Sequence, residues 1–399
     1  MNERPLRLGI STCPNDTFLF HALLSGEVEV AGHRLEIELL DVQELNERLI
    51  AGDFDVAKAS YHLALRLADE LVALPTGSAL GFGNGPLLLA RAGLESQRPG
   101  AASRVLCPGE HTTASLLYRA FHEAGNEAEQ VVFSEIMPAL EAGDADFGVC
   151  IHEGRFTYAE RGLALVEDLG SVWETATASP LPLGGIFARR GLGDAAIDAV
   201  QDALVRSLDR AEADRDATLP TMKRYAQELS DDVVWSHVDL YVNEWTRDLG
   251  DVGRAAIDEL ARRGAAAGVV PGGASLAVFE PFAERRVFHL VPLDGADEVP
   301  ESGTLAPPSL DAEGFVHLSF PEQLAGTLDV HFEGVERVLL LELDRARVQK
   351  DVRHEISRGG ASFPHLYRAL DLTLDVTDRW ELVRSDGRFR LPQALARRS

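Results

Sequence analysis

Apolar and polar positions along the first 70 residues follow two alternating periodicities. Short apolar or period-two runs predict strands, and apolar residues at three- and four-residue spacing predict helices. The predicted order is strand 6–10, helix 17–26, strand 33–40, helix 42–52, strand 54–60 and helix 61–70. This alternation is typical of an α/β fold with a mostly parallel sheet and helices on its faces.

One part of this pattern returns later in the chain. Residues 49–60 and 140–152 both consist of a helix end, an Ala-Gly-Asp turn and a strand. The first strand ends at Ser60 and the second at His152. Coincidence is the alternative explanation for so short a repeat. Two similar lobes would each place a polar residue at the carboxyl end of a strand, where open α/β sheets bind ligands.

Two apolar strands with Gly and Pro, at 81–91 and 179–190, enclose the second copy of the pattern. We interpret them as crossovers from a first lobe to a second lobe and back, with glycines suited to close packing or a hinge. The sequence therefore predicts lobe 1 at about 1–88 and 186–283, and lobe 2 at about 89–185.

Helical patterns continue to about residue 268 and are expected to cover lobe 1. In the clearest of them, Val234, Val238 and Tyr241 share one face. A breaker cluster follows at 269–275. The net charge is also unevenly distributed. Residues from 284 onward contain 15 basic and 20 acidic residues, a net charge of 15 − 20 = −5, whereas the whole chain has a net charge of −26. We predict a two-lobed domain at 1–283 and a small α+β domain at 284–399.

The acidic composition bears on possible partners and on location. A net charge of −26 argues against binding to nucleic acid or to an anionic membrane surface. The sequence shows no signal peptide and no apolar run of about 18 residues that would span a membrane. The cysteines Cys13, Cys107 and Cys150 are too few and scattered for a disulfide framework. We expect a cytoplasmic protein, and the sequence leaves a homo-oligomer open.

Polar residues gather at three predicted strand ends. The candidate substrate-binding residues there are Ser11, Thr12, Asn15, Asp16, Lys58, Ala59, Ser60, Thr112 and Thr113. Pro14 indicates a helix start with Asn15 or Asp16 as its N-cap. A helix starting near Thr112 would offer free backbone N–H groups to an anion, so we expect a small carboxylate as ligand. For each loop taken alone, ordinary helix capping is the alternative explanation of its polar residues.

His152 is the titratable group that the repeated strand delivers to this edge. Its ordinary pKa near 6.5 suits a general base at neutral pH. Glu153, Arg155 or Asp16 could orient it. A hydrogen-bonded structural histidine is the alternative. The histidines lack the spacing of metal ligands, so we expect no metal.

Several segments in order resemble one family. They are STCPNDTFLFHAL, DVAKASYHL, GEHTTASLL, GVCIHEGRFTY and HVDLYVNEWTRDLG, between residues 7 and 268. They are similar to the MqnD family, the 1,4-dihydroxy-6-naphthoate synthases of the futalosine route to menaquinone. The related chorismate dehydratases share the fold, but they are not known for the STCPNDTF opening.

The resemblance implies a two-lobed fold of the periplasmic-binding-protein type II kind. It implies a carbon–carbon lyase that converts cyclic dehypoxanthinylfutalosine to 1,4-dihydroxy-6-naphthoate and dihydroxyacetone, without cofactor. The family's catalytic base falls on His152. Its substrate contacts fall on Lys58–Ser60 and on Thr112, Thr113 and Ala114.

The resemblance ends near residue 272. The remaining segment resembles a small bacterial domain family of unknown function, whose members carry a similar FxHxS and FPHLY and are thought to look like a distant ADP-ribosyltransferase-type fold. Its polar candidates are His289, His317, Ser319 and His365. They are compatible with a nucleotide pocket or with structural hydrogen bonding.

Two other classes of function stay open on sequence grounds. The two-lobed fold also serves non-catalytic binding proteins, so the chain could be a cytosolic binder or sensor of a small carboxylate. The active site could also lie in the C-terminal module. A base at the end of the lobe 2 strand favours the lyase, because a binder needs only hydrogen-bond donors there.

Overall fold

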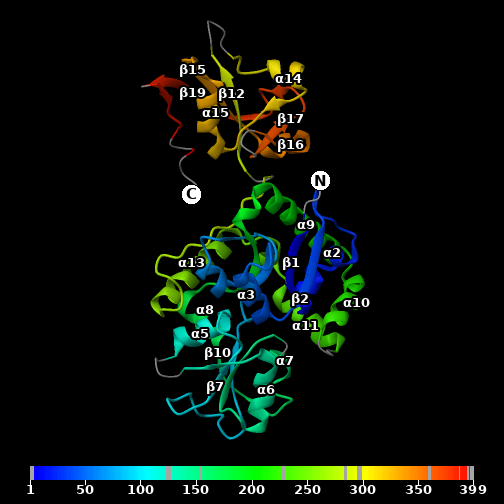
Figure 1. The fold of residues 1–399 in the computed structure, drawn as a ribbon, viewed down its shortest axis with the longest axis vertical. Coiled ribbons are helices and arrows are strands. Elements are labelled where there is room, and N and C mark those ends of the chain that lie inside the picture. The colour runs from blue at the N-terminus through cyan, green and yellow to red at the C-terminus, as the bar shows by residue number, and fades with distance from the viewer. Residues whose placement is uncertain are drawn as a thin grey trace. The chain divides into compact units, whose positions relative to one another are not determined.

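The computed structural model divides the chain into two compact units, Met1–Phe279 and Glu280–Ser399 (Figure 1). Residues 283 and 284, where the sequence places the domain boundary, lie outside the described residues. The described residues are 4–122, 127–152, 154–226, 230–282, 285–293, 299–357, 361–385, 387–392 and 395.

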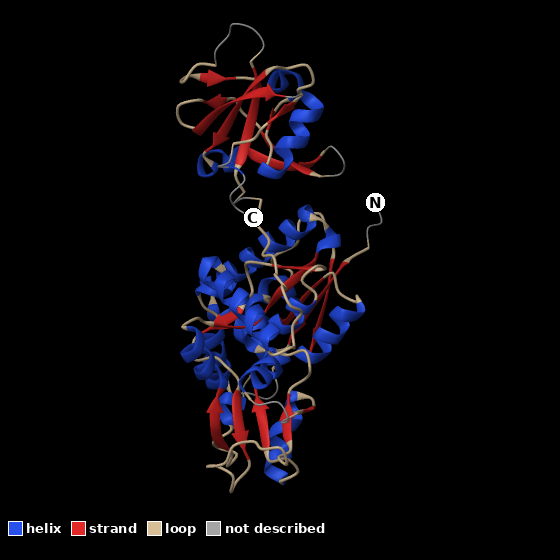
Figure 2. Cartoon of the chain, turned by 90° about the vertical axis from the view of Figure 1, so that its left-hand side faces the viewer, coloured by secondary structure: helices blue, strands red, loops and turns tan. Residues whose placement is uncertain are grey.

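The described residues of the N-terminal unit form two sheets, one in each lobe. Sheet A of lobe 1 has the order β2 (Leu35–Leu40), β1 (Leu6–Ser11), β3 (Val56–Ser60), β11 (Leu181–Arg189) and β4 (Leu71–Ala73), and β5 (Ala79–Gly81) also pairs with β11. Sheet B of lobe 2 has the order β10 (Ala164–Asp168), β6 (Leu87–Ala90), β9 (Phe147–Cys150), β7 (Val105–Cys107) and β8 (Glu129–Gln130). Figure 2 shows the strands of sheet B side by side below the helix-rich lobe 1.

Both sheets are mixed rather than mostly parallel. β1 runs parallel to β2 and β3, and β7 runs parallel to β8 and β9. The strands that carry the chain between the lobes, β6 and β11, run antiparallel to their neighbours. The expectation of a mostly parallel sheet is therefore wrong for β6 and β11. Each of these strands arrives from the other lobe and enters its sheet from the opposite end, so it runs antiparallel to its neighbours.

Helices surround both sheets, and their ends follow local sequence signals. They are α1 (Pro14–Leu19), α2 (His21–Ser25), α3 (Val42–Ala51), α4 (Tyr61–Arg66), α5 (Thr113–Phe121), α6 (Phe133–Ala142), α7 (Gly154–Thr157), α8 (Leu169–Thr177), α9 (Asp194–Ala213), α10 (Arg215–Tyr225), α11 (Asp231–Tyr241), α12 (Glu244–Arg247) and α13 (Gly250–Ala266). Gly52 ends α3 with φ +84°, a left-handed conformation that glycine adopts without strain.

The later helices pack mainly against elements of lobe 1. α9, α10 and α11 all contact α1, and α13 contacts β11, α4 and α5. One core cluster joins β1 and α1 to α9 and α11 through Ile10, Phe18, Leu204 and Val238. This packing buries α1 on all sides, so its polar side chains need partners within the protein.

The C-terminal unit is small and rich in β-strands. Its largest sheet has the order β12 (Val287–Pro292), β15 (Arg337–Leu343), β19 (Val376–Ser385) and β20 (Arg388–Phe389). A second sheet contains β14 (Val316–His317), β17 (Ser362–Leu366) and β16 (Val352–Ile356), and a third pairs β13 (Thr304–Leu305) with β18 (Leu370–Asp371). The helices are α14 (Pro308–Glu313), α15 (Leu324–His331) and α16 (Arg345–Val348). Across the described part of the chain, no helix combines the length and apolar character needed to cross a membrane.

Candidate active site

The loop between β1 and α1 forms one wall of a cavity in the N-terminal unit. Cys13 is the N-cap of α1 and Pro14 is its first residue. The prediction of Asn15 or Asp16 as N-cap is wrong, because both residues lie inside the helix and their side chains bond elsewhere. Asp16 accepts hydrogen bonds from Ser11 Oγ at 2.5 Å and Asn15 Nδ2 at 3.0 Å.

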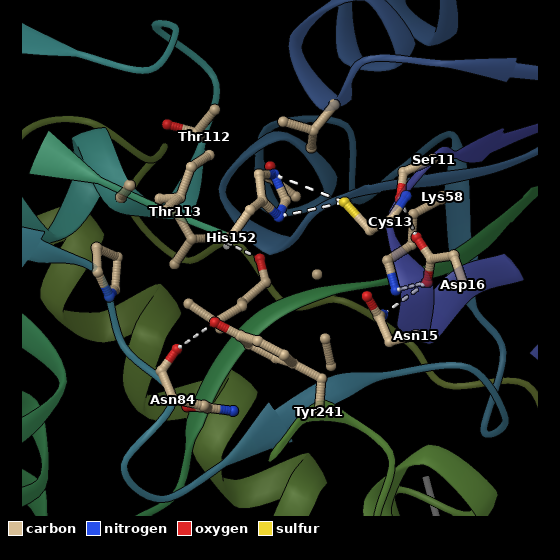
Figure 3. A pocket seen from close by; sticks show the side chains of 18 of the residues that line it. Ser11, Cys13, Asn15, Asp16, Lys58, Asn84, Thr112, Thr113, His152 and Tyr241 are labelled. Atoms are coloured by element: carbon tan, nitrogen blue, oxygen red, sulfur yellow. Dashed lines mark hydrogen bonds and ion pairs between the residues drawn. The ribbon is translucent and has the colours of Figure 1, made fainter. Parts of the chain in front are cut away.

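A buried ion pair joins this loop to the next strand. Lys58 Nζ of β3 lies 2.7 Å from Asp16 Oδ1, and the two side chains are only 7% and 2% exposed. Lys58 also donates to the carbonyl of Gly77 at 3.1 Å. The Lys58 charge is therefore compensated by Asp16, which fixes the loop relative to the end of β3 (Figure 3).

The start of α5 forms the wall contributed by lobe 2. The Thr112 side chain accepts a hydrogen bond from the Ser115 N–H, as an N-cap does. Thr113 Oγ1 donates to the carbonyl of Leu183 at 2.6 Å. Since both hydroxyl groups have partners inside the protein, the groups of this turn suited to an anion are its first backbone N–H groups.

His152 follows β9 and faces lobe 1. Its φ of +57° lies in the left-handed region, which a non-glycine residue adopts at a cost of about 1 kcal/mol or more. Its Nδ1 lies 3.3 Å from Cys13 Sγ, a contact between the two lobes that Figure 3 shows. The Phe133 ring lies edge-on to the imidazole at 5.0 Å between ring centres. These contacts hold the imidazole at the cleft.

A second histidine, His237 on α11, lies close to His152. Its Nε2–H donates to Asn15 Oδ1 at 2.9 Å, and its ring lies 6.5 Å from that of His152. Burial is the main cause that lowers the pKa of His237 to about 3, with smaller contributions from His152 and Lys58. His237 is therefore neutral near pH 7 and presents a buried Nδ1 without a hydrogen-bond partner among the described residues.

The cavity of about 90 Å³ between these walls brings together all but one of the site residues predicted for the two-lobed domain. The predicted residues that line it are Ser11, Asn15, Asp16, Lys58, Ala59, Ser60, Thr112, Thr113, Ala114 and His152. Thr12 is not among the lining residues. Glu153, one of the groups considered as orienting His152, lies outside the described residues. The other two have different partners, since Arg155 pairs with Asp168 and Asp16 with Lys58.

Sequence reasoning missed the contribution of α11. His237 and Tyr241 both line the cavity, and the Tyr241 hydroxyl donates to the Asn84 carbonyl at 3.3 Å. A signal was present, because His237 and Tyr241 are four residues apart on the otherwise apolar face of this helix. Cys13 also lines the cavity, whereas Cys107 and Cys150 are buried outside its lining. No cluster of His, Cys, Asp or Glu suited to a metal occurs within the described residues.

A family model described as menaquinone biosynthesis matches residues 6–266. The chain belongs to this menaquinone biosynthesis family. A second family model, described as a protein of unknown function (DUF952), matches residues 290–377 and confirms the resemblance predicted for the tail.

Curated relatives agree with this family. The chain is 44% identical over 255 residues to a 1,4-dihydroxy-6-naphtoate synthase of Thermus thermophilus, covering 64% of this chain and 92% of the relative. It is 42% identical over 276 residues to the enzyme of that name from Streptomyces coelicolor, covering 68% and 96%. The alkanesulfonate-binding protein SsuA of Xanthomonas axonopodis pv. citri is 16% identical with a TM-score of 0.52, covering 68% of this chain and 96% of that one. This last likeness shows the fold alone, and it confirms the binding-protein type of architecture.

Proposed function

We propose that the chain is a lyase that converts cyclic dehypoxanthinylfutalosine to 1,4-dihydroxy-6-naphthoate and dihydroxyacetone in the cytoplasm. The observation that carries the proposal is His152, held in a strained backbone conformation at a cleft whose opposite wall comes from the other lobe. Strained residues persist where the surrounding structure holds them, often at active sites. The relatives named above support the choice of product.

His152 is the general base in this proposal. It removes a proton next to a carbonyl group of the substrate, which starts ring opening and release of the three-carbon fragment. Formation of the aromatic ring then favours the product. The substrate carboxylate accepts hydrogen bonds from the first N–H groups of α5, because Lys58 is already paired with Asp16. These steps require a base and donors, so we propose no cofactor.

The lobes must separate before the substrate enters. A cavity of about 90 Å³ is smaller than the roughly 300–1,000 Å³ of typical ligand pockets. Closure around the substrate would exclude water and bring the base of lobe 2 against the substrate held by lobe 1.

The direct test is turnover by the full chain. Incubation with cyclic dehypoxanthinylfutalosine is expected to yield 1,4-dihydroxy-6-naphthoate, detected by chromatography against the authentic compound. Tight binding of substrate without any product would contradict the lyase and favour the alternative, a binder or sensor of small carboxylates.

Cys13 is the group that we propose to orient His152. Its side chain makes no capping bond to α1, so Cys13→Ala removes the contact with His152 without removing a helix cap. We expect kcat to fall about tenfold with KM unchanged, and Cys13→Ser to restore most of the activity, since a hydroxyl group can also hydrogen-bond Nδ1. The pH profile of kcat/KM is expected to shift in Cys13→Ala. A profile and rate equal to those of the wild type in the Ala variant would remove Cys13 from the proposal.

A further inference from the structure

The C-terminal unit contains a cavity of about 670 Å³, within the range of ligand pockets. All four polar residues that the sequence singles out there line it, namely His289, His317, Ser319 and His365. They come from β12, from β14 and the residues just after it, and from β17. His317 and His365 are direct partners across the β14–β17 pair.

His289 presents an acceptor nitrogen to this cavity. Its side chain is buried on β12, and its Nδ1 lies 2.9 Å from the carbonyl oxygen of His317. A carbonyl only accepts, so Nδ1 carries the hydrogen. Burial lowers the pKa of His289 to about 4, which makes the ring neutral and leaves Nε2 with its lone pair. Among the described residues, this nitrogen has no hydrogen-bond partner.

His365 presents a second nitrogen in a similar way. Its Nδ1 lies 2.7 Å from Glu355 Oε2, which also accepts from the Tyr367 hydroxyl at 2.8 Å. These two hydrogen bonds lower the pKa of Glu355, so the carboxylate is ionised and holds the hydrogen of His365 on Nδ1. Phe315 stacks on the imidazole at 4.1 Å and fixes its plane. A carboxylate that orients one ring nitrogen leaves Nε2 for a ligand.

The charge and shape of the cavity narrow the class of ligand. The described residues that line it include no Lys, Arg, Asp or Glu. Among these described residues a phosphate group would meet histidines but no lysine or arginine, which argues against the nucleotide considered on sequence grounds. Ser319 and Thr327, whose hydroxyl oxygens lie 3.2 Å apart, add polar groups, and Leu290, Phe332 and Phe363 add apolar surface.

We propose that this cavity is a second ligand site, for an uncharged aromatic compound whose hydroxyl groups donate hydrogen bonds to Nε2 of His289 and Nε2 of His365. Each of these two histidines uses Nδ1 within the protein, and both line the same cavity. The proposal stands apart from the lyase, because it concerns residues of the C-terminal unit alone.

The test is binding of 2,7-dihydroxynaphthalene to the full chain, measured by isothermal titration calorimetry. His365→Phe and His289→Leu are each expected to weaken binding of this probe to the cavity of the C-terminal unit at least tenfold. The loss of a buried hydrogen bond predicts an effect of this size. His354→Gln is the matched control, since His354 is a half-buried histidine of the same unit outside the cavity lining, and its binding should stay within twofold of wild type. Naphthoate formation should be unchanged in all three variants, which separates this site from the lyase.

Two further probes extend the test, and the first of them needs only the wild-type protein. 2,7-Dimethoxynaphthalene has the same ring but no O–H donors, and it should bind wild-type protein at least tenfold more weakly. ADP should show no binding that depends on His365. Equal affinity for the dihydroxy and dimethoxy probes, absence of binding by the dihydroxy probe, or ADP binding lost in His365→Phe would each overturn the proposal.

Discussion

Replacement of His152 by Asn is expected to lower kcat for naphthoate formation about 10³-fold, within the range that general-base catalysis supplies. KM should change by less than about threefold, because the N–H groups of α5 and the Asp16–Lys58 pair remain. Asn is the informative substitute, since it tolerates the left-handed conformation of residue 152 better than Ala does.

His237 is not expected to replace the missing base. Its Nε2–H is committed to Asn15, and with a pKa of about 3 its Nδ1 is a weak base at neutral pH. The measurement is the initial rate of naphthoate formation at several substrate concentrations. His21→Asn is the control, because His21 bonds Thr221 outside the cavity. A His152→Asn rate within tenfold of wild type would place the base elsewhere.

Replacement of Lys58 by Met is expected to destabilise the N-terminal unit by about 3–5 kcal/mol, because it leaves the Asp16 carboxylate buried without its cation. The double variant Asp16→Asn/Lys58→Met should recover a large part of this loss, since it removes the uncompensated charge as well. The loss of stability thus comes from a buried charge left without its partner, and not from the absence of the ion pair itself.

Urea unfolding followed by tryptophan fluorescence measures this effect. Trp173, Trp235 and Trp245 lie in the N-terminal unit, so the signal reports mainly on it. Lys223→Met is the control, because the Lys223–Asp231 pair is about half exposed and should contribute less than about 1 kcal/mol. Equal midpoints for wild type and Lys58→Met, or no recovery in the double variant, would contradict a buried pair that supports the loop.

Local patterns in the sequence determined most of the elements that carry the site. The ends of β1 and β3, the start of α5 near Thr112 and the glycine after α3 follow from periodicity and capping over a few neighbouring residues. The strand predicted to end at His152 is shorter, because β9 ends at Cys150 and His152 lies in the turn after it. The polar residues at those strand ends were predicted for the same reason, because parallel strands place their carboxyl ends at one edge of a sheet.

Only the tertiary structure decided which side chains meet. Asn15 and His237 are 222 positions apart, and Cys13 and His152 are 139 apart, so no local periodicity relates them. The N-cap of α1 was mispredicted for the same reason: Asp16 favours an N-cap by its chemistry, but the packing of α9, α10 and α11 buries α1 and pairs Asp16 with Lys58 instead. Burial makes an unpaired carboxylate costly, and this cost, which depends on the whole fold, outweighs a local capping preference of about 1 kcal/mol.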